Sequence, residues 1–202
     1  MVRRKLRRMW RAARRLFTVL LVVCLGYLVQ VCVMPYFRVL GITPSVMFPV
    51  MAIITVCFGK LSALWIGLFY GLLMESMQAN VTLLNLLIYP VTALLTCALF
   101  SDKSQQQLEY ERGIGKAGRN TNPLIRTPAC AAVASAVYET VNVAYIYLRG
   151  ADITGINILR ALVAVVINTL LTVVIMFPVR RWFGFSNRVE EDEAPKPYVS
   201  KA

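Results

Sequence analysis

Apolar segments long enough to cross a lipid bilayer recur along this chain of 202 residues. The clearest are 16–34, 82–100, 128–148 and 156–178, and a helical span needs about 20 predominantly apolar residues. Hydrophobic residues make up 58% of the chain and charged residues only 16%, whereas soluble domains carry about a quarter charged residues. The connecting stretches are too short to hold a soluble domain with its own core. The sequence therefore predicts an all-α integral membrane protein.

Two shorter apolar runs leave the number of spans open. Residues 44–58 and 61–74 each fall short of a straight span. They form either two spans that include flanking residues, or a re-entrant hairpin shielded by the other helices. We expect a bundle of six transmembrane helices, with four helices plus a re-entrant hairpin as the alternative. Six is favoured because the hairpin would leave Lys60 inside the membrane.

The distribution of basic residues predicts the orientation. Of the 22 Lys and Arg residues, all but Arg38, Arg149 and Arg160 fall on one side of the six-span arrangement. Cytoplasmic flanks and short loops accumulate Lys and Arg, so we expect both termini in the cytoplasm. The expected organisation is described by four segments: a basic cytoplasmic arm at 1–15, a bundle at 16–182, a cytoplasmic loop at 101–127 within it, and a disordered polar tail at 183–202.

A net charge of +12 could indicate nucleic acid as a partner. The basic residues, however, cluster at helix ends and do not form a stripe with interleaved aromatic residues. Basic clusters beside a spanning helix are attracted to the anionic lipids of the cytoplasmic leaflet. We expect anionic lipid at the cytoplasmic face and no nucleic acid.

A group of polar residues falls inside two of the apolar segments. Glu139 lies in the middle of 128–148, where a lone acidic side chain costs about 2.5 to 3.5 kcal/mol. Ser135 and Asn142 share its helix face, and a rise of about 1.5 Å per residue places Asn168 at the same depth. We expect a buried polar layer of Ser135, Glu139, Asn142 and Asn168. It could join helices, hold a ligand or proton, or contact a spanning partner. The chain could also form a homo-oligomer, through a face that the sequence does not identify.

A second group lies around the next turn. Gly67 and Gly71 form a GxxxG pattern, which allows close approach of helix backbones. Glu75 ends that segment and Asn85 begins the following one. These four residues are candidates for helix packing or for a partner interface, with a partner helix held against the two glycines. Glu75 could instead extend to water. We also expect Glu139→Leu to disturb bundle stability more than Glu75→Gln.

No catalytic set is visible in the sequence. The chain has no histidine, no pair of carboxylates within one segment at the bilayer centre, and no glycine loop suited to phosphate. The five cysteines occur singly, without the spacing of a metal site, and we expect them to be small buried hydrophobic residues. The prediction is a protein that is not an enzyme and has no cofactor.

Five short motifs occur in order along the bundle: Ile42-Thr43-Pro44-Ser45, Gly67 to Glu75, Leu86-Leu87-Ile88-Tyr89, Asn168-Thr169-Leu170-Leu171 and Phe177-Pro178-Val179-Arg180-Arg181. Their order, spacing and loop placement resemble the bacterial rod shape-determining MreD family. The resemblance implies a non-catalytic, multi-pass component of the inner membrane that helps to position peptidoglycan synthesis and so controls cell shape. It also implies association with an MreC-like bitopic protein and, through it, with the MreB filament and peptidoglycan synthases.

The same family is similar in fold to the S components of energy-coupling-factor vitamin transporters, which implies an alternative function. A substrate-binding subunit of that kind would need a mainly apolar pocket with a few convergent polar groups. Glu139, Asn142 and Asn168 are the residues that could supply them.

Overall fold

The computed structural model describes residues 2–39, 41–77, 83–101, 103, 105–115, 122–150, 152 and 154–183. Over these residues the chain is helical, with one isolated β-bridge between Val39 and Ile42 and no β-strand. The elements are α1 (Val2–Cys32), the 3-10 helix η1 (Met34–Tyr36), α2 (Met47–Phe58), α3 (Lys60–Met77), α4 (Leu84–Phe100), α5 (Gln105–Gly113), α6 (Pro123–Leu148) and α7 (Gly155–Phe183). Residues 184–202 of the expected tail lie outside the described residues.

Three stretches are long and apolar enough to cross a membrane: Leu16–Tyr36, Leu124–Leu148 and Gly155–Val179. The helices α2, α3 and α4 are also apolar, but they are shorter. The expectation of an all-helical chain with membrane-spanning character is confirmed at this level.

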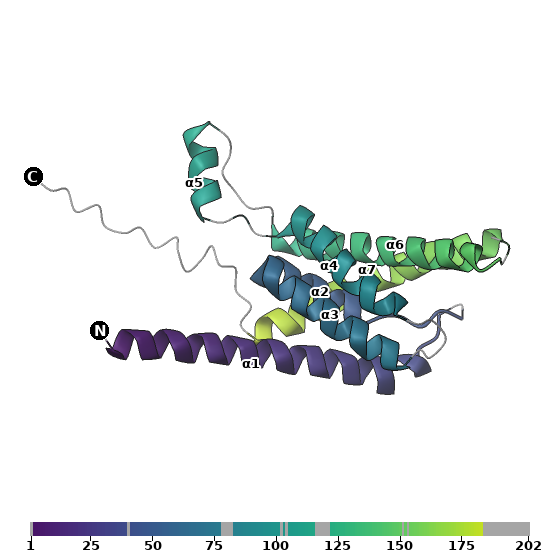
Figure 1. Ribbon diagram of the computed structural model, residues 1–202, viewed down its shortest axis with the longest axis horizontal. Coiled ribbons are helices and arrows are strands. Elements are labelled where there is room, and N and C mark those ends of the chain that lie inside the picture. The colour runs from purple at the N-terminus through teal and green to yellow at the C-terminus, as the bar shows by residue number, and fades with distance from the viewer. Residues whose placement is uncertain are drawn as a thin grey trace, which may run out of the picture.

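The short helix α2 occupies the centre of the bundle. It packs against α1, α3, α4, α6 and α7 (Figure 1), and every residue from Met47 to Val56 is buried. Its Phe48 ring lies 5.8 Å from the Tyr89 ring of α4 and 5.2 Å from the Tyr138 ring of α6, measured between centroids. Aromatic pairs at these separations are favourable beyond their buried area, so this cluster ties three helices together at the core.

The sequence around Gly59 turns the chain directly from α2 into α3. Gly59 is the single residue between the two helices and has a φ of +81°, a backbone conformation that glycine adopts without steric cost. The two helices therefore run antiparallel, and Lys60 starts α3 at the end of the bundle rather than within it.

Another glycine sets the position of α1. A Cβ atom at Gly26 would lie 2.9 Å from Tyr70 Oη and 3.0 Å from a methyl group of Val50. The Tyr70 hydroxyl donates a hydrogen bond to the Val23 carbonyl at 3.3 Å. The first helix can approach α2 and α3 this closely only because residue 26 has no side chain.

Two helix boundaries differ from the sequence expectation because proline does not interrupt either helix. The helix α6 begins at Pro123, five residues before Pro128, and Asn122 Oδ1 caps it by accepting the Leu124 N–H at 3.0 Å. The helix α7 continues through Pro178 to Phe183. Neighbouring groups make proline tolerable inside membrane helices. The expected loop at 101–127 consequently contains α5 and the first turn of α6.

The described segments that carry most of the basic residues lie at one end of the bundle. The N-terminal part of α1 extends beyond the other helices at that end, where α3 and α6 begin and α2, α4 and α7 finish (Figure 1). The expected basic arm at 1–15 is helical from Val2 and continuous with the apolar part of α1.

The cysteines do not share one environment. Cys97 and Cys130 are buried, Cys57 is half-buried, and Cys24 and Cys32 are exposed on α1. The expectation of buried cysteines is therefore wrong for the two on α1, whose side chains lie where no other described residue covers that helix.

Candidate functional site

The N-terminus of α2 is held by side chains from distant helices. Asn168 Oδ1 on α7 accepts the backbone N–H of Ser45 at 2.8 Å. The same side chain donates through Nδ2 to Ser135 Oγ on α6, also at 2.8 Å. Asn168 is 3% exposed and Ser135 is fully buried. One amide side chain thus fixes α2 to both long helices of the second half of the chain.

A second side-chain amide, that of Gln30, holds the backbone at the same end of α2. Gln30 Oε1 on α1 accepts the Val46 N–H at 2.7 Å, and Gln30 Nε2 donates to the Pro44 carbonyl at 3.4 Å. The first N–H groups of a helix lack partners within the helix, and no side chain of α2 itself caps them. We call the set Gln30, Pro44, Ser45, Val46, Ser135 and Asn168 the amide node.

The amide node lies deep in the bundle. Ser135 and Asn168 are near the middle of the two apolar stretches Leu124–Leu148 and Gly155–Val179. Non-helical backbone at such a depth is tolerated only where protein surrounds it, because an unpaired backbone group in hydrocarbon costs several kcal/mol. The node supplies the missing partners, so it allows the chain to enter the bundle interior as a non-helical segment before α2 begins.

Glu75, near the end of α3, caps the N-terminus of the next helix, α4. Its carboxylate accepts the Leu83 N–H at 2.5 Å and the Asn85 N–H at 3.3 Å. Leu83 has a φ of +64°, a left-handed conformation that costs a non-glycine residue about 1–2 kcal/mol. A carboxylate at a helix N-terminus also interacts favourably with the helix dipole. The acidic group of α3 therefore fixes the start of α4, and residues 78–82 between them lie outside the described residues.

The GxxxG face of α3 is covered by α4. A Cβ atom at Gly67 would lie 2.7 Å from Pro90 Cα, and one at Gly71 would lie 2.8 Å from the Asn85 carbonyl oxygen. Both contacts are with backbone, which cannot move aside cheaply. The two glycines thus pack a neighbouring helix of the same chain, and a partner helix cannot use the same face in this arrangement.

Asn85 connects the hairpin to α6. Its Oδ1 accepts a hydrogen bond from the Tyr138 hydroxyl at 3.2 Å, and the residue is 3% exposed. Because Tyr138 belongs to the aromatic cluster with Phe48 and Tyr89, this bond gives the hydroxyl of a half-buried tyrosine a partner beside the core.

The expected polar layer forms only in part. The structure joins Ser135 to Asn168, but Glu139 lies one turn farther along α6 and is half-buried, as is Asn142. Within the described part of the chain no hydrogen-bond donor or cation contacts the Glu139 carboxylate. The expected alignment of Glu139 with Asn168 is wrong: Asn168 pairs with Ser135, one turn before Glu139. The register of two packed helices is set by their contacts and does not follow from residue counts along each helix.

The residues that sequence reasoning missed are Gln30, Ser45 and Gly26. Gln30 carries the one side-chain amide in the apolar run 16–34. A polar group of this kind inside a membrane segment indicates a contact within the protein, so the sequence did contain a signal for it. Ser45 follows Pro44 at the start of an apolar run, and serine is typical of helix N-termini. No pattern in the sequence showed that Asn168 would bind at this point.

The hydrogen bonds of the amide node and of Glu75 hold helices together and fix the positions of backbone groups. Among the described residues no group of three or more His, Cys, Asp and Glu side chains could hold a metal ion. The buried polar side chains of the node and the hairpin are committed to contacts between helices. Comparison of the chain with protein-family models, with curated proteins and with solved structures finds no match.

Proposed function

We propose that this protein is a non-catalytic membrane scaffold of the bacterial cell-elongation machinery, similar in role to the MreD family. It holds an MreC-like bitopic protein and so helps to position peptidoglycan synthesis. The observation that carries the proposal is the contact between Ser45 and Asn168, because each belongs to a different motif on which the resemblance depends. A third motif, Gly67 to Glu75, sets the packing of α3 on α4.

We further propose that six helical segments cross the membrane and that both termini are cytoplasmic. The gathering of basic segments at one end of the bundle supports this orientation. With 12 residues, α2 measures only about 18 Å. The β-bridge brings Val39 and Ile42 side by side, so only the stretch 42–46 before α2 can be extended. At about 3.3 Å per residue it covers about 13 Å of the remaining depth, while the amide node satisfies its final backbone groups.

The interior favours a scaffold over a transport subunit. The side chains of α2 fill the space between α4, α6 and α7. Both polar atoms of the Asn168 amide are already engaged, and Glu139 and Asn142 do not converge on it. These are the three residues that a vitamin pocket would have used, so their separation argues against the alternative function.

Depletion in a rod-shaped bacterial host, followed by microscopy and pull-down of the tagged protein, tests the proposal. Rounding of the cells and recovery of a bitopic partner are expected. Complementation with Asn168→Leu should fail to restore rod shape, whereas Asn157→Leu, a half-buried residue near the start of α7, should restore it at equal expression. Normal rods after depletion would contradict the scaffold role, and a vitamin-like ligand bound in a 1:1 ratio to the purified protein would favour transport.

A further inference from the structure

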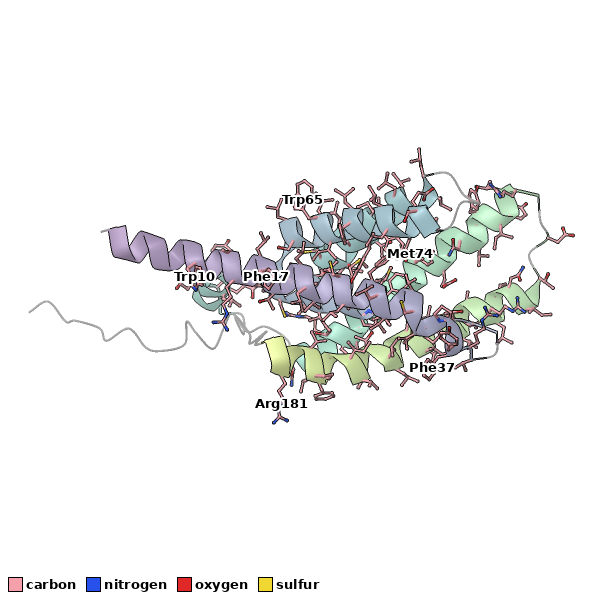
Figure 2. All side chains as sticks on the ribbon, turned by 90° about the horizontal axis from the view of Figure 1, so that it is seen from below. Trp10, Phe17, Phe37, Trp65, Met74 and Arg181 are labelled. Carbon is pink, nitrogen blue, oxygen red and sulfur yellow. The ribbon has the colours of Figure 1, made fainter. Side chains whose placement is uncertain are left out.

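The helices reach different heights at the end of the bundle opposite the basic arm, which we call the far end. There α4 begins at Leu84, whereas α6 continues to Leu148 and α7 begins at Gly155. Figure 1 shows α6 and α7 extending beyond α3 and α4 at this end. In Figure 2 the same two helices reach beyond Met74 of α3. The far end is therefore stepped, with α6 and α7 on its high side.

A hydrogen bond between α4 and α6 gives the height of the step. Tyr138 of α6 donates to Asn85 of α4, and the two helices run in opposite directions. Two residues farther toward the far end on each helix, Leu83 therefore lies at about the height of Thr140. From that height α6 continues for eight residues to Leu148, which is about 12 Å at about 1.5 Å per residue.

The helix α7 gives the same height. Its Asn168 donates to Ser135 of α6, and these two helices are also antiparallel. Counting from this bond places Thr140 level with Val163 of α7. The helix extends from there to Gly155, eight residues nearer the far end and again about 12 Å. Two independent contacts thus agree on the size of the step.

At the end near the basic arm the same helices finish level. By the same count, Phe100 at the end of α4 lies at the height of Pro123 at the start of α6. The difference in length is therefore confined to the far end. Tilting the whole bundle would not remove it, because a tilt that levels one end makes the other end uneven.

The surface above the step is apolar and uncovered by the described part of the chain. We call residues 141–148 and 155–162 the α6–α7 overhang. Its largely exposed side chains include Tyr147, Leu148, Ile156, Ile158, Leu159 and Leu162. Arg160 is exposed as well, and side chains lean toward the N-terminus of their helix. The Arg160 side chain thus leans toward the far end, where its charge can reach water.

The foot of the step is polar. The Glu75 carboxylate accepts the backbone N–H groups of Leu83 and Asn85, so it is held at the height where α4 begins and does not extend toward the far end. A carboxylate is costly to place in hydrocarbon. We therefore expect headgroups or water at the height of Glu75, even though apolar side chains of the overhang continue for about 12 Å beyond it.

No flat bilayer fits both sides of this molecule. The hydrocarbon core of a typical bilayer is about 30 Å thick. The helix α4, with 17 residues, is about 25 Å long, whereas the apolar stretches Leu124–Leu148 and Gly155–Val179, with 25 residues each, are about 37 Å long. A bilayer becomes thinner beside a short segment and thicker beside a long one.

The tip of α6 has the residues of a membrane boundary. Tyr147 is exposed, and Arg149 follows the last residue of the helix, with its guanidinium over the Tyr145 ring. Tyrosine is enriched where hydrocarbon meets headgroups. The boundary beside α6 therefore lies near Tyr147, well above the foot of the step.

We propose that the lipid leaflet at the far end is thinner beside α3 and α4 than beside α6 and α7, by up to about 10 Å. Lipid tails cover the α6–α7 overhang, while headgroups and water descend to Glu75 at the foot of the step. The protein thereby deforms the bilayer on one side only. This inference requires that the helices cross a membrane and does not depend on the proposed docking of a bitopic partner.

Depth measurements with nitroxide spin labels test the step. The exposed Cys24 and Cys32 and the half-buried Cys57 are replaced by alanine, while the buried Cys97 and Cys130 are kept, and the unlabelled parent gives the background. One new cysteine per protein is labelled, and the protein is reconstituted in phosphatidylcholine vesicles with oleoyl chains. Depth follows from collision rates with oxygen, which dissolves in hydrocarbon, and with a water-soluble nickel chelate.

Four exposed positions give a matched comparison. Leu83→Cys and Thr140→Cys lie at the same height on the low and high sides of the step, and Tyr147→Cys lies near the tip of α6. The labels at 83 and 147 should be near the headgroups, and the label at 140 should be about 10 Å deeper. Leu87→Cys, one turn along α4, should be about 6 Å deeper than Leu83→Cys, which shows that lipid covers the low side.

Thinner vesicles give a second readout. A bilayer of phosphatidylcholine with myristoleoyl chains is closer to the length of α4, so it needs less deformation on the low side. The difference in depth between positions 83 and 140 should then fall by about half or more. A difference that does not change with chain length would show that the two heights are not set by the bilayer and would contradict the proposal.

Three further outcomes would overturn it. Equal, shallow depths at positions 83 and 140 would show that the overhang stands outside the bilayer. Equal depths of about 10 Å would show that the start of α4 lies in hydrocarbon and that the leaflet is not thinned. Low collision rates with both reagents would show that a protein, such as a second copy of the chain, covers the position. None of these outcomes bears on cell shape or partner recovery, so the scaffold role is tested separately.

Discussion

Asn168 Oδ1 accepts the backbone N–H of Ser45 at 2.8 Å, although 123 positions separate the two residues in the chain. This bond places the non-helical entry of the central helix against the middle of α7. An amide side chain suits the task because it offers an acceptor to Ser45 and a donor to Ser135 at once.

Replacing Asn168 by leucine should lower stability substantially. The change removes the acceptor for the buried Ser45 N–H and the donor to Ser135, and an unsatisfied buried group costs about 1–3 kcal/mol. Thermal unfolding in detergent should show a clear fall in Tm for Asn168→Leu and a small effect for Asn157→Leu. Similar Tm values for the two variants would contradict the role assigned to the amide node.

Glu75 should tolerate a change that keeps an acceptor better than one that removes it. Glu75→Gln retains one side-chain oxygen for the N-terminus of α4, whereas Glu75→Leu leaves the Leu83 and Asn85 amides without the carboxylate. We expect a loss of about 1–2 kcal/mol for leucine and a smaller loss for glutamine. Denaturant titration in detergent measures both, with Glu109→Leu on the exposed face of α5 as the control. Equal losses in the two Glu75 variants would rule out the cap.

Alanine at Gly67 should destabilise the α3–α4 hairpin. Its Cβ would lie 2.7 Å from Pro90 Cα, so the helices must separate, at a cost of about 1–3 kcal/mol for overpacking. Gly155→Ala is the matched control, because a Cβ there has no atom within 4 Å. Stability should fall only in the first variant. Wild-type stability in Gly67→Ala would indicate that the two helices are farther apart than described.

Glu139→Leu should leave stability unchanged or raise it slightly. A half-buried carboxylate without a described partner makes no favourable contact that leucine would remove, and transfer of such a group from water is costly. This reverses the expectation from sequence, in which Glu139→Leu was the more damaging change when compared with Glu75→Gln. Unfolding of both variants under one set of conditions decides the order, and a larger loss for Glu139→Leu would restore the first expectation.

The sequence by itself determined the helical class, the apolar segments and most of their ends, because helix formation in a membrane follows from local hydrophobicity and the need to satisfy backbone groups within each segment. It also marked Gly67, Gly71, Ser135 and Asn168 as residues of helix contacts. Only the tertiary structure decided which helices those residues join. A small residue indicates close packing and an amide indicates a hydrogen bond, but neither shows which helix is the neighbour.

The placement of Glu139 shows the same limit. Residue counts from the helix ends put it level with Asn168, and the extensions of α6 to Pro123 and of α7 to Phe183 change both counts equally. The bond from Asn168 to Ser135 instead sets the register of the two helices one turn earlier on α6. The contact of Ser45 with Asn168 was equally out of reach, because a hydrogen bond across 123 positions depends on how the whole bundle packs. Local chemistry sets which segments become helices, whereas the pairing of their polar groups is fixed only when all the helices are in place.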